Sequence, residues 1–552
     1  MICTAANALW LAGCLGEAAR FRRAMGRVRD AQMHILREIL RIGEETMFAR
    51  RHGLRTGTTA QEYRARVPVR SYDAFEPEIN LIANGERDVL TRERVRLFEP
   101  TSGSTTATKL IPYTQSLQRQ FQRGIKPWIA DLFTNDPELM RGQAYWSVSP
   151  ATGVARQTPA GIPVGFGDDS EYVGGWSGAL VRAVLAVPPS LRLIPDVNRC
   201  QYETLLALVR SESLRLISIW NPTFLSIIVD GLSASAERLQ RDLHGTPRAR
   251  TLHHALNAAS AAERHATLWP RLRLISCWAD ANAAGPADRL AAMFPHARIQ
   301  AKGLIATEGF VSLPLTGRDG AALAVRSHFF EFAPLNSAGA VDEAAPLLAH
   351  ELECGRRYAV ILSTAAGLYR YRLDDVVEVI GRERQCPLVR FSGRQGYVSD
   401  WFGEKLHEAH VASAFRRTYS SAFRRSLPPP AFAMLACDRD LSPPAYVLYM
   451  ESAADDETLV SIAANIDDGL RANFHYDYAR LLGQLGPVRV FRAEGAAQTY
   501  LAAAIAAGQR ARDVKTLALD RRDGWSARFT GRSIRPPSQS IPSGSAPLRL
   551  AR

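Results

Sequence analysis

From about residue 96 onward, short apolar and β-branched runs alternate with helical stretches and Gly/Pro turns. The clearest runs are 214–220, 271–278, 357–363 and 376–380. Strands that alternate with helices along a chain are typical of α/β layers, in which helices cover a sheet. The chain is also 46% hydrophobic and 22% charged, which excludes collagen-like, fully disordered and disulfide-scaffold classes. We therefore predict an α/β fold.

The first 95 residues have a different character. Their large apolar side chains recur at helix-like spacing between arginines, as in Trp10, Phe21, Met25, Met33, Ile35 and Ile39. Residues 1–16 lack a leading basic residue, so we expect them to open the fold and not to be a secretion signal. No run of 18 uncharged apolar residues occurs, so no membrane-spanning helix is expected.

A chain of 552 residues is long enough for several domains. The Gly-containing stretch 391–400 predicts a boundary, which gives a large N-terminal domain over 1–395. The smaller C-terminal unit, 396–530, has strand-like runs at 430–437, 444–450 and 487–492, with helices expected at 456–472 and 497–507. Residues 531–552 carry Pro, Ser and Arg with few large apolar groups, and we predict a disordered tail there.

The formal net charge is +13, from 68 basic and 55 acidic residues. A basic excess allows a nucleic-acid or membrane partner, but no block of five consecutive basic residues occurs, which favours arginines used as general surface cations. We therefore expect neither partner. Seven scattered cysteines without a C-x-x-C pair predict reduced thiols in a cytoplasmic protein. Only five of the basic residues are lysines, which marks positions where a compact ammonium is useful: Lys109, Lys126, Lys302, Lys405 and Lys515.

The sharpest local motif is the loop Thr101-Ser102-Gly103-Ser104-Thr105-Thr106-Ala107-Thr108-Lys109, which follows a strand-like run at 94–98. Hydroxyl groups, backbone N–H groups and the lysine can all donate to phosphate oxygens. The loop is not a Walker A motif, because Leu110 follows the lysine where Ser or Thr is required. Taken alone, such a turn is also compatible with a plain loop.

Two carboxylate motifs follow. Glu308 lies between an apolar run and Gly309, where it can hold Mg²⁺ together with substrate phosphates. Asp374 and Asp375 interrupt a strand-like run over 367–377, and a carboxylate at a strand end can accept ribose hydroxyls. A solvated loop glutamate and a turn aspartate are the alternatives for these motifs in isolation.

The order of these motifs is more specific than any one of them. The chain resembles the auxin-responsive-promoter (Gretchen Hagen) family of acyl-acid amido synthetases, particularly its bacterial members, within the adenylate-forming ligases. The resembling strings cover nearly the whole chain except the tail: FEPTSGSTTATKLIPYT (98–114), GLIATEGFVSLPL (303–315), GLYRYRLDDVVEVIG (367–381), GRQGYVSDWFGEKLHE (393–408), ANFHYDYARLLGQLGP (472–487) and GQRARDVK (508–515).

The resemblance implies a role for each matching position. The ATP phosphates would be bound by Thr101, Ser102, Gly103, Ser104, Thr105 and Lys109. Thr307 and Glu308 would lie near the α-phosphate, with Glu308 holding Mg²⁺. Asp375 would bind the ribose and Arg394 would touch the nucleotide from the hinge. The catalytic lysines would be Lys405, at the opening of the C-terminal domain, and Lys515, which reaches the α-phosphate and the substrate carboxylate.

Two positions depart from the family pattern. Relatives usually have Gly where this loop has Thr106-Ala107, and they have Gly where this chain has Asp374. The first change restricts the loop backbone. The second places two adjacent carboxylates beside a polyphosphate, which weakens ATP binding unless one is turned away or neutralised.

The resemblance further implies a large adenylate-forming N-terminal domain closed by a smaller, mobile α/β C-terminal domain. The implied reaction uses ATP and Mg²⁺ to adenylate a carboxylic acid, then transfers the acyl group to an amine, expected to be an amino acid. Two alternatives stay open: transfer to a thiol such as that of coenzyme A, and a non-catalytic Arg-rich binding protein on a ligase shell.

Overall fold

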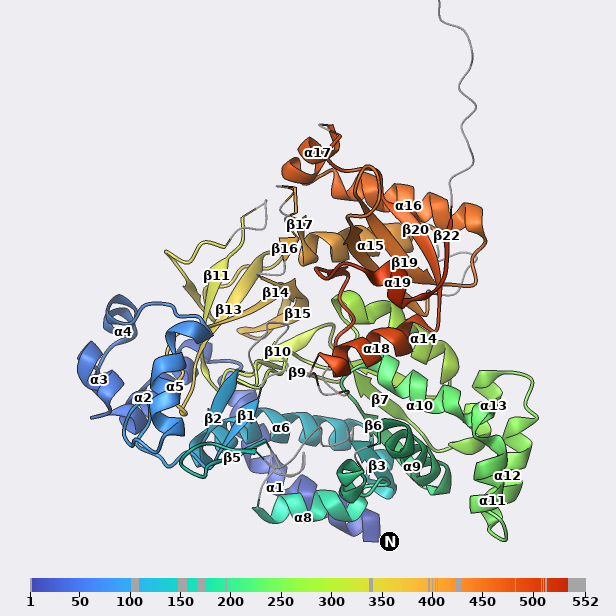
Figure 1. The fold of residues 1–552 in the computed structure, drawn as a ribbon. Coiled ribbons are helices and arrows are strands. Elements are labelled where there is room, and N and C mark those ends of the chain that lie inside the picture. Colours follow the sequence, from blue (N-terminus) through green and yellow to red (C-terminus); the bar gives the residue numbers. More distant parts are fainter. Residues whose placement is uncertain are drawn as a thin grey trace, which may run out of the picture.

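The structure is a computed structural model that describes residues 2–100, 109–146, 156–165, 175–194, 196–336, 341–395, 398–399, 401–402, 404, 406–422, 429–481, 483–507, 509, 511 and 514–534. Figure 1 shows two units, a larger one built from the N-terminal residues and a smaller one above it. The larger unit contains helices and three sheets, and the smaller unit contains one principal sheet with helices on both sides.

Helices dominate the first 95 residues, as the apolar spacing predicts: α1 (Ile2–Ala24), α2 (Val28–Gly43), α3 (Met47–His52), α4 (Ala60–Arg66) and α5 (Glu76–Ala83). By length and apolar composition, α1 could cross a membrane. In this fold it packs against α6 (Gln115–Asn135) and α8 (Gly175–Val184), and it buries Trp10, Cys14 and Phe21. The prediction that this segment opens the fold agrees with that burial.

A small sheet follows, with strand order β2-β1-β5-β4. Its strands are β1 (Leu97–Pro100), β2 (Leu110–Tyr113), β4 (Arg156–Gln157) and β5 (Pro163–Val164). β1 and β2 are antiparallel, and Pro100 lies opposite Leu110. The strand expected at 94–98 is therefore present, shifted by two to three residues.

A fully parallel sheet, in the order β3-β6-β7-β8, forms the second layer. Its strands are β3 (Gln143–Trp146), β6 (Leu214–Ser218), β7 (Leu274–Cys277) and β8 (Arg298–Ala301), and the connecting helices include α9 (Val197–Arg210), α10 (Pro222–Ala234), α11 (Ala236–Asp242), α12 (Pro247–Leu256), α13 (Ala261–Leu268) and α14 (Ala284–Met293). Parallel strands need such crossovers, so the alternating pattern in the sequence correctly predicted this layer.

The third sheet of the larger unit has seven strands in the order β12-β11-β13-β14-β15-β10-β9. All neighbours are antiparallel. Its strands are β9 (Ser312–Pro314), β10 (Ala321–Leu323), β11 (Phe329–Pro334), β12 (Leu347–Leu348), β13 (Arg357–Ser363), β14 (Tyr371–Glu383) and β15 (Cys386–Arg394).

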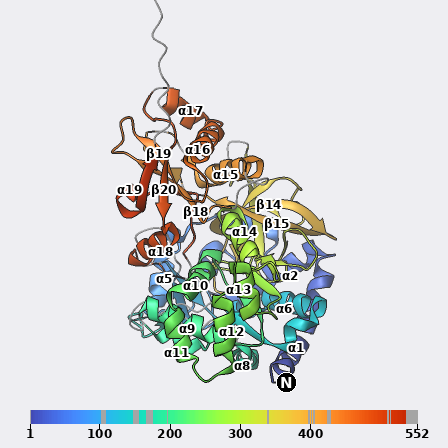
Figure 2. The same cartoon turned by 90° about the vertical axis from the view of Figure 1, so that its right-hand side faces the viewer.

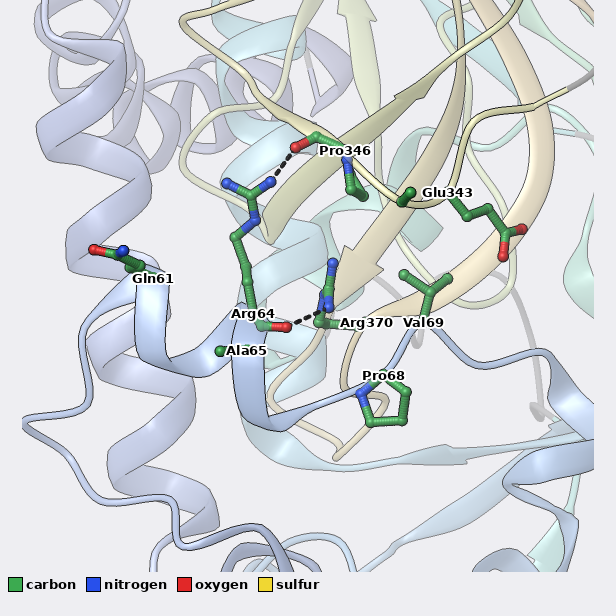
Figure 3. Close-up of a pocket in the computed structure, with 9 residues that line it drawn as sticks. Gln61, Arg64, Ala65, Pro68, Val69, Glu343, Pro346 and Arg370 are labelled. Atoms are coloured by element: carbon green, nitrogen blue, oxygen red, sulfur yellow. Dashed lines mark hydrogen bonds between the residues drawn. The ribbon is translucent and has the colours of Figure 1, made fainter.

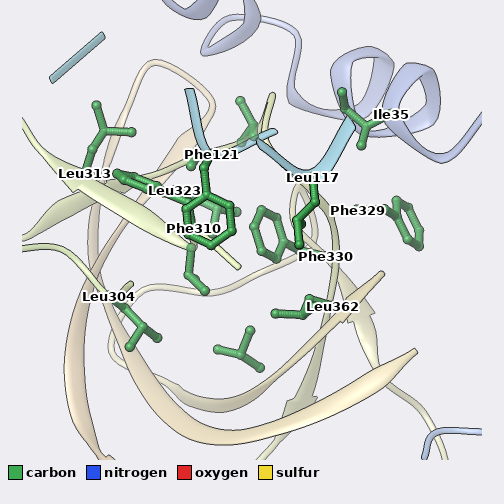
Figure 4. Close-up of a cluster of buried hydrophobic side chains, with 14 of the residues drawn as sticks. Ile35, Leu117, Phe121, Leu304, Phe310, Leu313, Leu323, Phe329, Phe330 and Leu362 are labelled. Atoms are coloured by element: carbon green, nitrogen blue, oxygen red, sulfur yellow. The ribbon is translucent and has the colours of Figure 1, made fainter. Parts of the chain in front are cut away.

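Large apolar side chains fill the space between α2, α6 and this seven-stranded sheet, as Figure 4 shows. Phe121 of α6 meets Phe310 edge to face, with ring centroids 6.4 Å apart. Gly124 permits this approach, because a Cβ at that position would lie 2.2 Å from the Phe310 ring. This packing fixes the segment that carries Glu308, two residues before Phe310.

The smaller unit is built on a five-stranded sheet in the order β21-β18-β19-β20-β22. Its elements are α15 (Glu408–Ala422), β18 (Phe432–Asp438), β19 (Ala445–Glu451), α16 (Asp456–Leu470), α17 (Phe474–Leu481), β20 (Arg489–Glu494), α18 (Ala496–Ala506), β21 (Leu519–Asp520), α19 (Trp525–Arg528) and β22 (Thr530–Ile534), preceded by the short pair β16 (Val398–Ser399) and β17 (Leu406–His407). The two views in Figures 1 and 2 agree that α18 lies between this sheet and α10 of the larger unit.

The structure differs from the predicted tail at one end. β22 pairs with the edge of β20, so ordered structure continues to Ile534 and the tail predicted at 531–552 begins too early. Residues 535–552 lie outside the described part of the chain. Short polar strands carry little apolar signal, and this one gains its stability from the exposed edge that it covers.

Candidate active site

The Ser/Thr loop is held at its base by a strand pair. Pro100 at the end of β1 lies opposite Leu110 at the start of β2, so the motif connects two antiparallel strands. Thr101, Ser102, Gly103, Ser104 and Thr105 lie outside the described residues, and Lys109 is the part of the motif that can be placed. Its Nζ is 5.5 Å from the Tyr72 ring centre, and the Leu110 N–H donates to the Tyr72 hydroxyl at 2.8 Å.

Glu308 lies in a tight turn between two bridged residues, Ile305 and Phe310. Its carboxylate is buried, with 6% of the residue exposed, and Thr307 beside it is half-buried. Tyr371 donates its hydroxyl to Glu308 Oε1 at 3.0 Å. Burial raises the pKa of Glu308, while the Arg394 charge and the Tyr371 hydrogen bond oppose that rise.

Asp375 and Arg394 face each other across β14 and β15. Arg394 Nε lies 3.2 Å from Asp375 Oδ1, and the buried carboxylate raises the pKa of the guanidinium. The N–H does not point at the oxygen, so both atoms lack a hydrogen-bond partner within the described structure. Buried polar atoms are normally satisfied. This unused capacity fits a ligand that brings both a donor and an acceptor, as a nucleotide does.

These groups form one cluster. Both Arg394 and Asp375 are close enough to Glu308 to influence its pKa, in opposite directions. Among the described residues, no three His, Cys, Asp or Glu side chains converge to form a metal site by themselves. One buried carboxylate is nevertheless the donor set that Mg²⁺ uses when phosphates complete its coordination, so Glu308 fits the predicted role.

Asp374 does not add a second free carboxylate. Its Oδ1 accepts from Arg372 Nε at 2.8 Å, and Arg372 Nη1 also donates to Glu343 at 2.7 Å. The φ angle of Asp374 is +65°, a left-handed value that glycine adopts readily. That angle agrees with the Gly that the family pattern leads us to expect at this position. The sequence predicts that two adjacent carboxylates weaken ATP binding unless one of them is neutralised. Arg372 neutralises Asp374 in this way.

Lys515 comes from the smaller unit but contacts the larger one. Its Nζ lies 4.5 Å from the Trp278 ring centre and 5.6 Å from the Phe391 ring centre. Asn221 fixes the neighbouring backbone by donating its Nδ2 to the Val514 carbonyl at 2.6 Å. Phe391 stands three residues before Arg394 on β15, so Lys515 approaches the strand that carries the nucleotide motif. Lys405 lies outside the described residues.

Two tyrosines were missed by the motif analysis. Tyr72 joins the base of the β1–β2 strand pair, and its own pKa is raised by burial and by carboxylates that include Glu308. Tyr371 binds Glu308 directly. Tyr371 and Asp375 are both buried on β14, although the positive φ of Asp374 between them interrupts the regular alternation of strand faces. Tyr371 lies in the strand-like run 367–377 that the sequence already singles out, whereas the proximity of Tyr72 requires tertiary packing.

A separate pocket of about 440 Å³ contains none of the predicted site residues. Arg64 and Arg370 line it, and Figure 3 shows Arg370 directed at the Arg64 carbonyl. Arg370 also forms a bidentate ion pair with the buried Glu331, at 2.9 and 3.0 Å. This ion pair joins β11 to the turn before β14, so we assign Arg370 a structural role in positioning the strand that carries Asp375.

Comparisons with known proteins agree with this architecture. Indole-3-acetic acid-amido synthetase GH3.3 of Arabidopsis thaliana is 25% identical over 492 residues, covering 80% of each chain. Indole-3-acetic acid-amido synthetase GH3.8 of Oryza sativa subsp. indica is 24% identical, covering 86% of this chain and 85% of that one. The AtGH3.15 acyl acid amido synthetase, solved in complex with 2,4-DB, superposes with a TM-score of 0.82 at 18% identity, covering 96% of this chain and 98% of that chain.

The domain comparison follows the order of the fold. Residues 17–299 match the GH3 family N-terminal domain, residues 321–394 the central domain and residues 409–521 the C-terminal domain. The central match ends at Arg394, the residue that pairs with Asp375. The three matches together span most of the 552 residues and confirm the resemblance drawn from the motifs. The chain therefore belongs to the GH3 family.

Proposed function

We propose that this protein is an ATP-dependent ligase that adenylates a carboxylic acid and transfers the acyl group to an amine, forming an amide. The acceptor is an amino acid, the second substrate is a small-molecule acid, and the cofactor is Mg²⁺. Family membership supports the reaction class. The observation that carries the proposal within the fold is the pair of the buried Asp375 and the half-buried Arg394, whose facing atoms are unsatisfied beside Glu308.

The chemistry has two steps. A carboxylate oxygen of the acid attacks the α-phosphorus of ATP, the bond to the β-phosphate oxygen breaks, and pyrophosphate leaves. The amine nitrogen then attacks the acyl carbon, AMP leaves with its oxygen, and the amine loses a proton. Negative charge accumulates on phosphate oxygens in the first step, so cationic groups aimed at them lower its barrier.

The residues divide this work by position. The loop 101–109, including Lys109, binds the ATP phosphates, and Asp375 accepts hydrogen bonds from the ribose hydroxyls. Arg394 contacts the nucleotide, and Glu308 would hold Mg²⁺, whose charge neutralises phosphate oxygens. Lys515 serves the α-phosphate and the reacting carboxylate. Lys405 opens the C-terminal domain and acts in catalysis.

A cytoplasmic location accompanies this proposal. All seven cysteines are free in the structure, and burial holds the pKa of Cys14, Cys277, Cys386 and Cys437 at about 12. Thiols in this state are unreactive and suit a reducing compartment. We propose neither a nucleic-acid nor a membrane partner.

The decisive experiment is ATP–pyrophosphate exchange over a panel of aryl, indolyl and aliphatic acids. We expect exchange that depends on an acid and on Mg²⁺. With the best acid, an amine panel and coenzyme A then distinguish amide from thioester formation. Folded protein that binds ATP but shows no exchange with any acid would favour the non-catalytic alternative.

Variants localise the activity. Asp375→Asn is expected to raise the ATP KM by about tenfold or more, because a charge-assisted hydrogen bond to ribose is lost. Asp230 of α10 provides a matched control: it is exposed and paired with Arg289. Asp230→Asn should leave the ATP KM unchanged. An equal effect of both variants would contradict the assignment of Asp375.

A further inference from the structure

The residues at or directly after the carboxyl ends of β6, β7 and β8 lie together at one edge of the parallel sheet. Ser218 ends β6, Trp278 follows β7, and Lys302 follows β8. The Lys302 N–H donates to the Cys277 carbonyl at 2.8 Å, which holds the last two strand ends together. In α/β sheets, ligands bind at the carboxyl ends of the strands. This edge is therefore the expected place for a small-molecule substrate in the parallel layer.

Lys302 has an unusual environment at this edge. Its Nζ donates to Ser218 Oγ at 2.6 Å and lies 5.0 Å from the Trp220 ring centre and 5.3 Å from that of Trp128. Trp128 is buried and fixed by a 3.0 Å hydrogen bond from its Nε1 to Gln300. The half-buried Lys302 thus places its ammonium near two indole rings, which attract a cation.

The aromatic residues connect Lys302 to Lys515. The Trp220 and Trp278 rings are 5.9 Å apart, and Lys515 lies over the Trp278 ring at 4.5 Å. The order along this edge is Lys515, Trp278, Trp220 and Lys302, with one ammonium at each end. We call these four residues the tryptophan–lysine row. In the proposed function Lys515 serves the reacting carboxylate, so Lys302 lies at the opposite end of the row.

We propose that Lys302 determines the acid substrate, and that this substrate is an aromatic acid with a second acceptor group distal to its reacting carboxylate. This inference rests on the proposed function. The indole faces of Trp220 and Trp278 suit a planar ring, and the ammonium of Lys302 suits a hydroxyl or carboxylate at its far end. Composition points the same way, since this chain retains only five lysines among its 68 basic residues.

The test compares acids that differ only at the distal position. The pairs are phenylacetate with 4-hydroxyphenylacetate, and benzoate with terephthalate, each measured by ATP–pyrophosphate exchange. Wild-type protein should prefer the acceptor-bearing member of at least one pair by about tenfold in kcat/KM, as one charge-assisted hydrogen bond supplies. Lys302→Met should bring that ratio close to one while leaving the ATP KM unchanged. Lys302→Arg should retain part of the preference.

Lys126 is the matched control, because it is a half-buried lysine on α6 outside the row. Lys126→Met should keep the wild-type ratio. A structural lysine makes a different prediction: Lys302→Met would lower the melting temperature and weaken both members of each pair equally. That result, or the absence of any preference in wild-type protein, would overturn the inference.

Calorimetric titration of the same acids separates this inference from the proposed function. Acid discrimination in binding that is lost in Lys302→Met, without any exchange activity, would refute the ligase proposal and keep the specificity role. Exchange activity in which the preference between the paired acids does not depend on Lys302 would support the ligase proposal and refute the specificity role of Lys302.

Discussion

Glu308 and Asp375 are two buried carboxylates that share one guanidinium, Arg394. Their environments differ. Asp375 faces Arg394 directly at 3.2 Å, whereas Glu308 is influenced by the Arg394 charge and also accepts a hydrogen bond from Tyr371. Burial raises the pKa of Glu308, and each of these partners reduces the size of that rise. Loss of the Arg394 charge or of the Tyr371 hydroxyl is therefore expected to raise the pKa of Glu308 further.

This sensitivity predicts a pH effect for Tyr371→Phe. A protonated Glu308 binds Mg²⁺ poorly, so activity should fall as the pH drops through its raised pKa. Without the Tyr371 hydroxyl the pKa rises further. The acidic limb of the exchange rate against pH should therefore move to higher pH, with the rate at alkaline pH largely retained. The measurement is kcat/KM for ATP between about pH 5 and pH 9.

Tyr358→Phe is a suitable control, because Tyr358 is a buried tyrosine of the same sheet whose hydroxyl accepts from the Glu353 N–H. It should leave the acidic limb in place. An acidic limb that stays fixed in Tyr371→Phe would show that Glu308 is not the group that titrates.

At the residue scale, the sequence pointed to Glu308, Asp375 and Arg394 because each lies in a short motif. It did not point to Tyr72, and it marked Lys302 only as one of the five lysines of the chain. Tyr72 reaches the base of the β1–β2 strand pair from a distant helical segment, and that proximity depends on packing among several elements. Lys302 directly precedes the motif that begins at Gly303, but its meaning depends on Trp128 and Trp220, which only the folded sheet brings to it.

Strand β14 contains a residue with an unusual backbone conformation, Asp374, without ending there. The paired acids were expected to interrupt a strand, yet β14 runs without a break from Tyr371 to Glu383. The irregularity is local: Asp374 adopts φ +65°, and the register with β15 shifts between Val376 and Val377. A bulge of this kind bends a strand and redirects its side chains. Leu373 and Asp374 have no partner in either register, since pairing with β13 passes from Arg372 to Val376 and pairing with β15 begins at Asp375. The paired acids therefore interrupt the ladder without ending the strand.

Substitutions at Asp374 should separate backbone strain from the ion pair. Asp374→Ala and Asp374→Gly both remove the contact with Arg372, but only alanine retains the cost of a positive φ. We expect Asp374→Ala to be less stable than Asp374→Gly by about 1 kcal/mol. The ATP KM of Asp374→Gly should equal or fall below that of the wild type. Denaturant unfolding and exchange kinetics measure these two quantities.

Equal stability of the alanine and glycine variants would mean that the left-handed angle carries no cost. Weaker ATP binding in Asp374→Gly, together with no effect of Asp375→Asn, would mean that the ribose contact belongs to Asp374.

Most other elements were predictable because their patterns are strong. The expected strands at 357–363, 430–437 and 444–450 appear within one or two residues as β13, β18 and β19. Strand β22 was missed because its outer residues are polar and its pairing partner is 36 residues or more away in the chain. The order of strands in the sheets could likewise not be predicted from the sequence, since β10 pairs with β15 across more than 60 residues.

At the scale of the whole molecule, the two units share buried surface. One apolar cluster contains Phe224 and Leu225 of α10 together with Leu501 of α18 and Val514. The hydrogen bond from Asn221 to the Val514 carbonyl lies beside it. Lys515 is therefore placed by a packed interface and not by its own side-chain contacts alone. The sequence indicated that this lysine has to reach the larger unit, and in this structure it contacts Trp278 there.

The position of Lys515 leads to a prediction about the two half-reactions. Lys515→Ala removes a charge that serves the transition state of adenylation, so that step should slow by about 10²–10³-fold, or ~3 kcal/mol. Its ring contacts are worth only about 1 kcal/mol, so the melting temperature and ATP affinity should change little. Pre-made acyl-AMP should restore much of the amide formation, because the second step does not include the adenylation transition state that Lys515 stabilises. Lys126→Ala, which removes a lysine elsewhere in the larger unit, should leave both half-reactions intact. A Lys515→Ala protein that adenylates at the wild-type rate would remove Lys515 from the active site, and the packed interface that positions it would then have a structural role only.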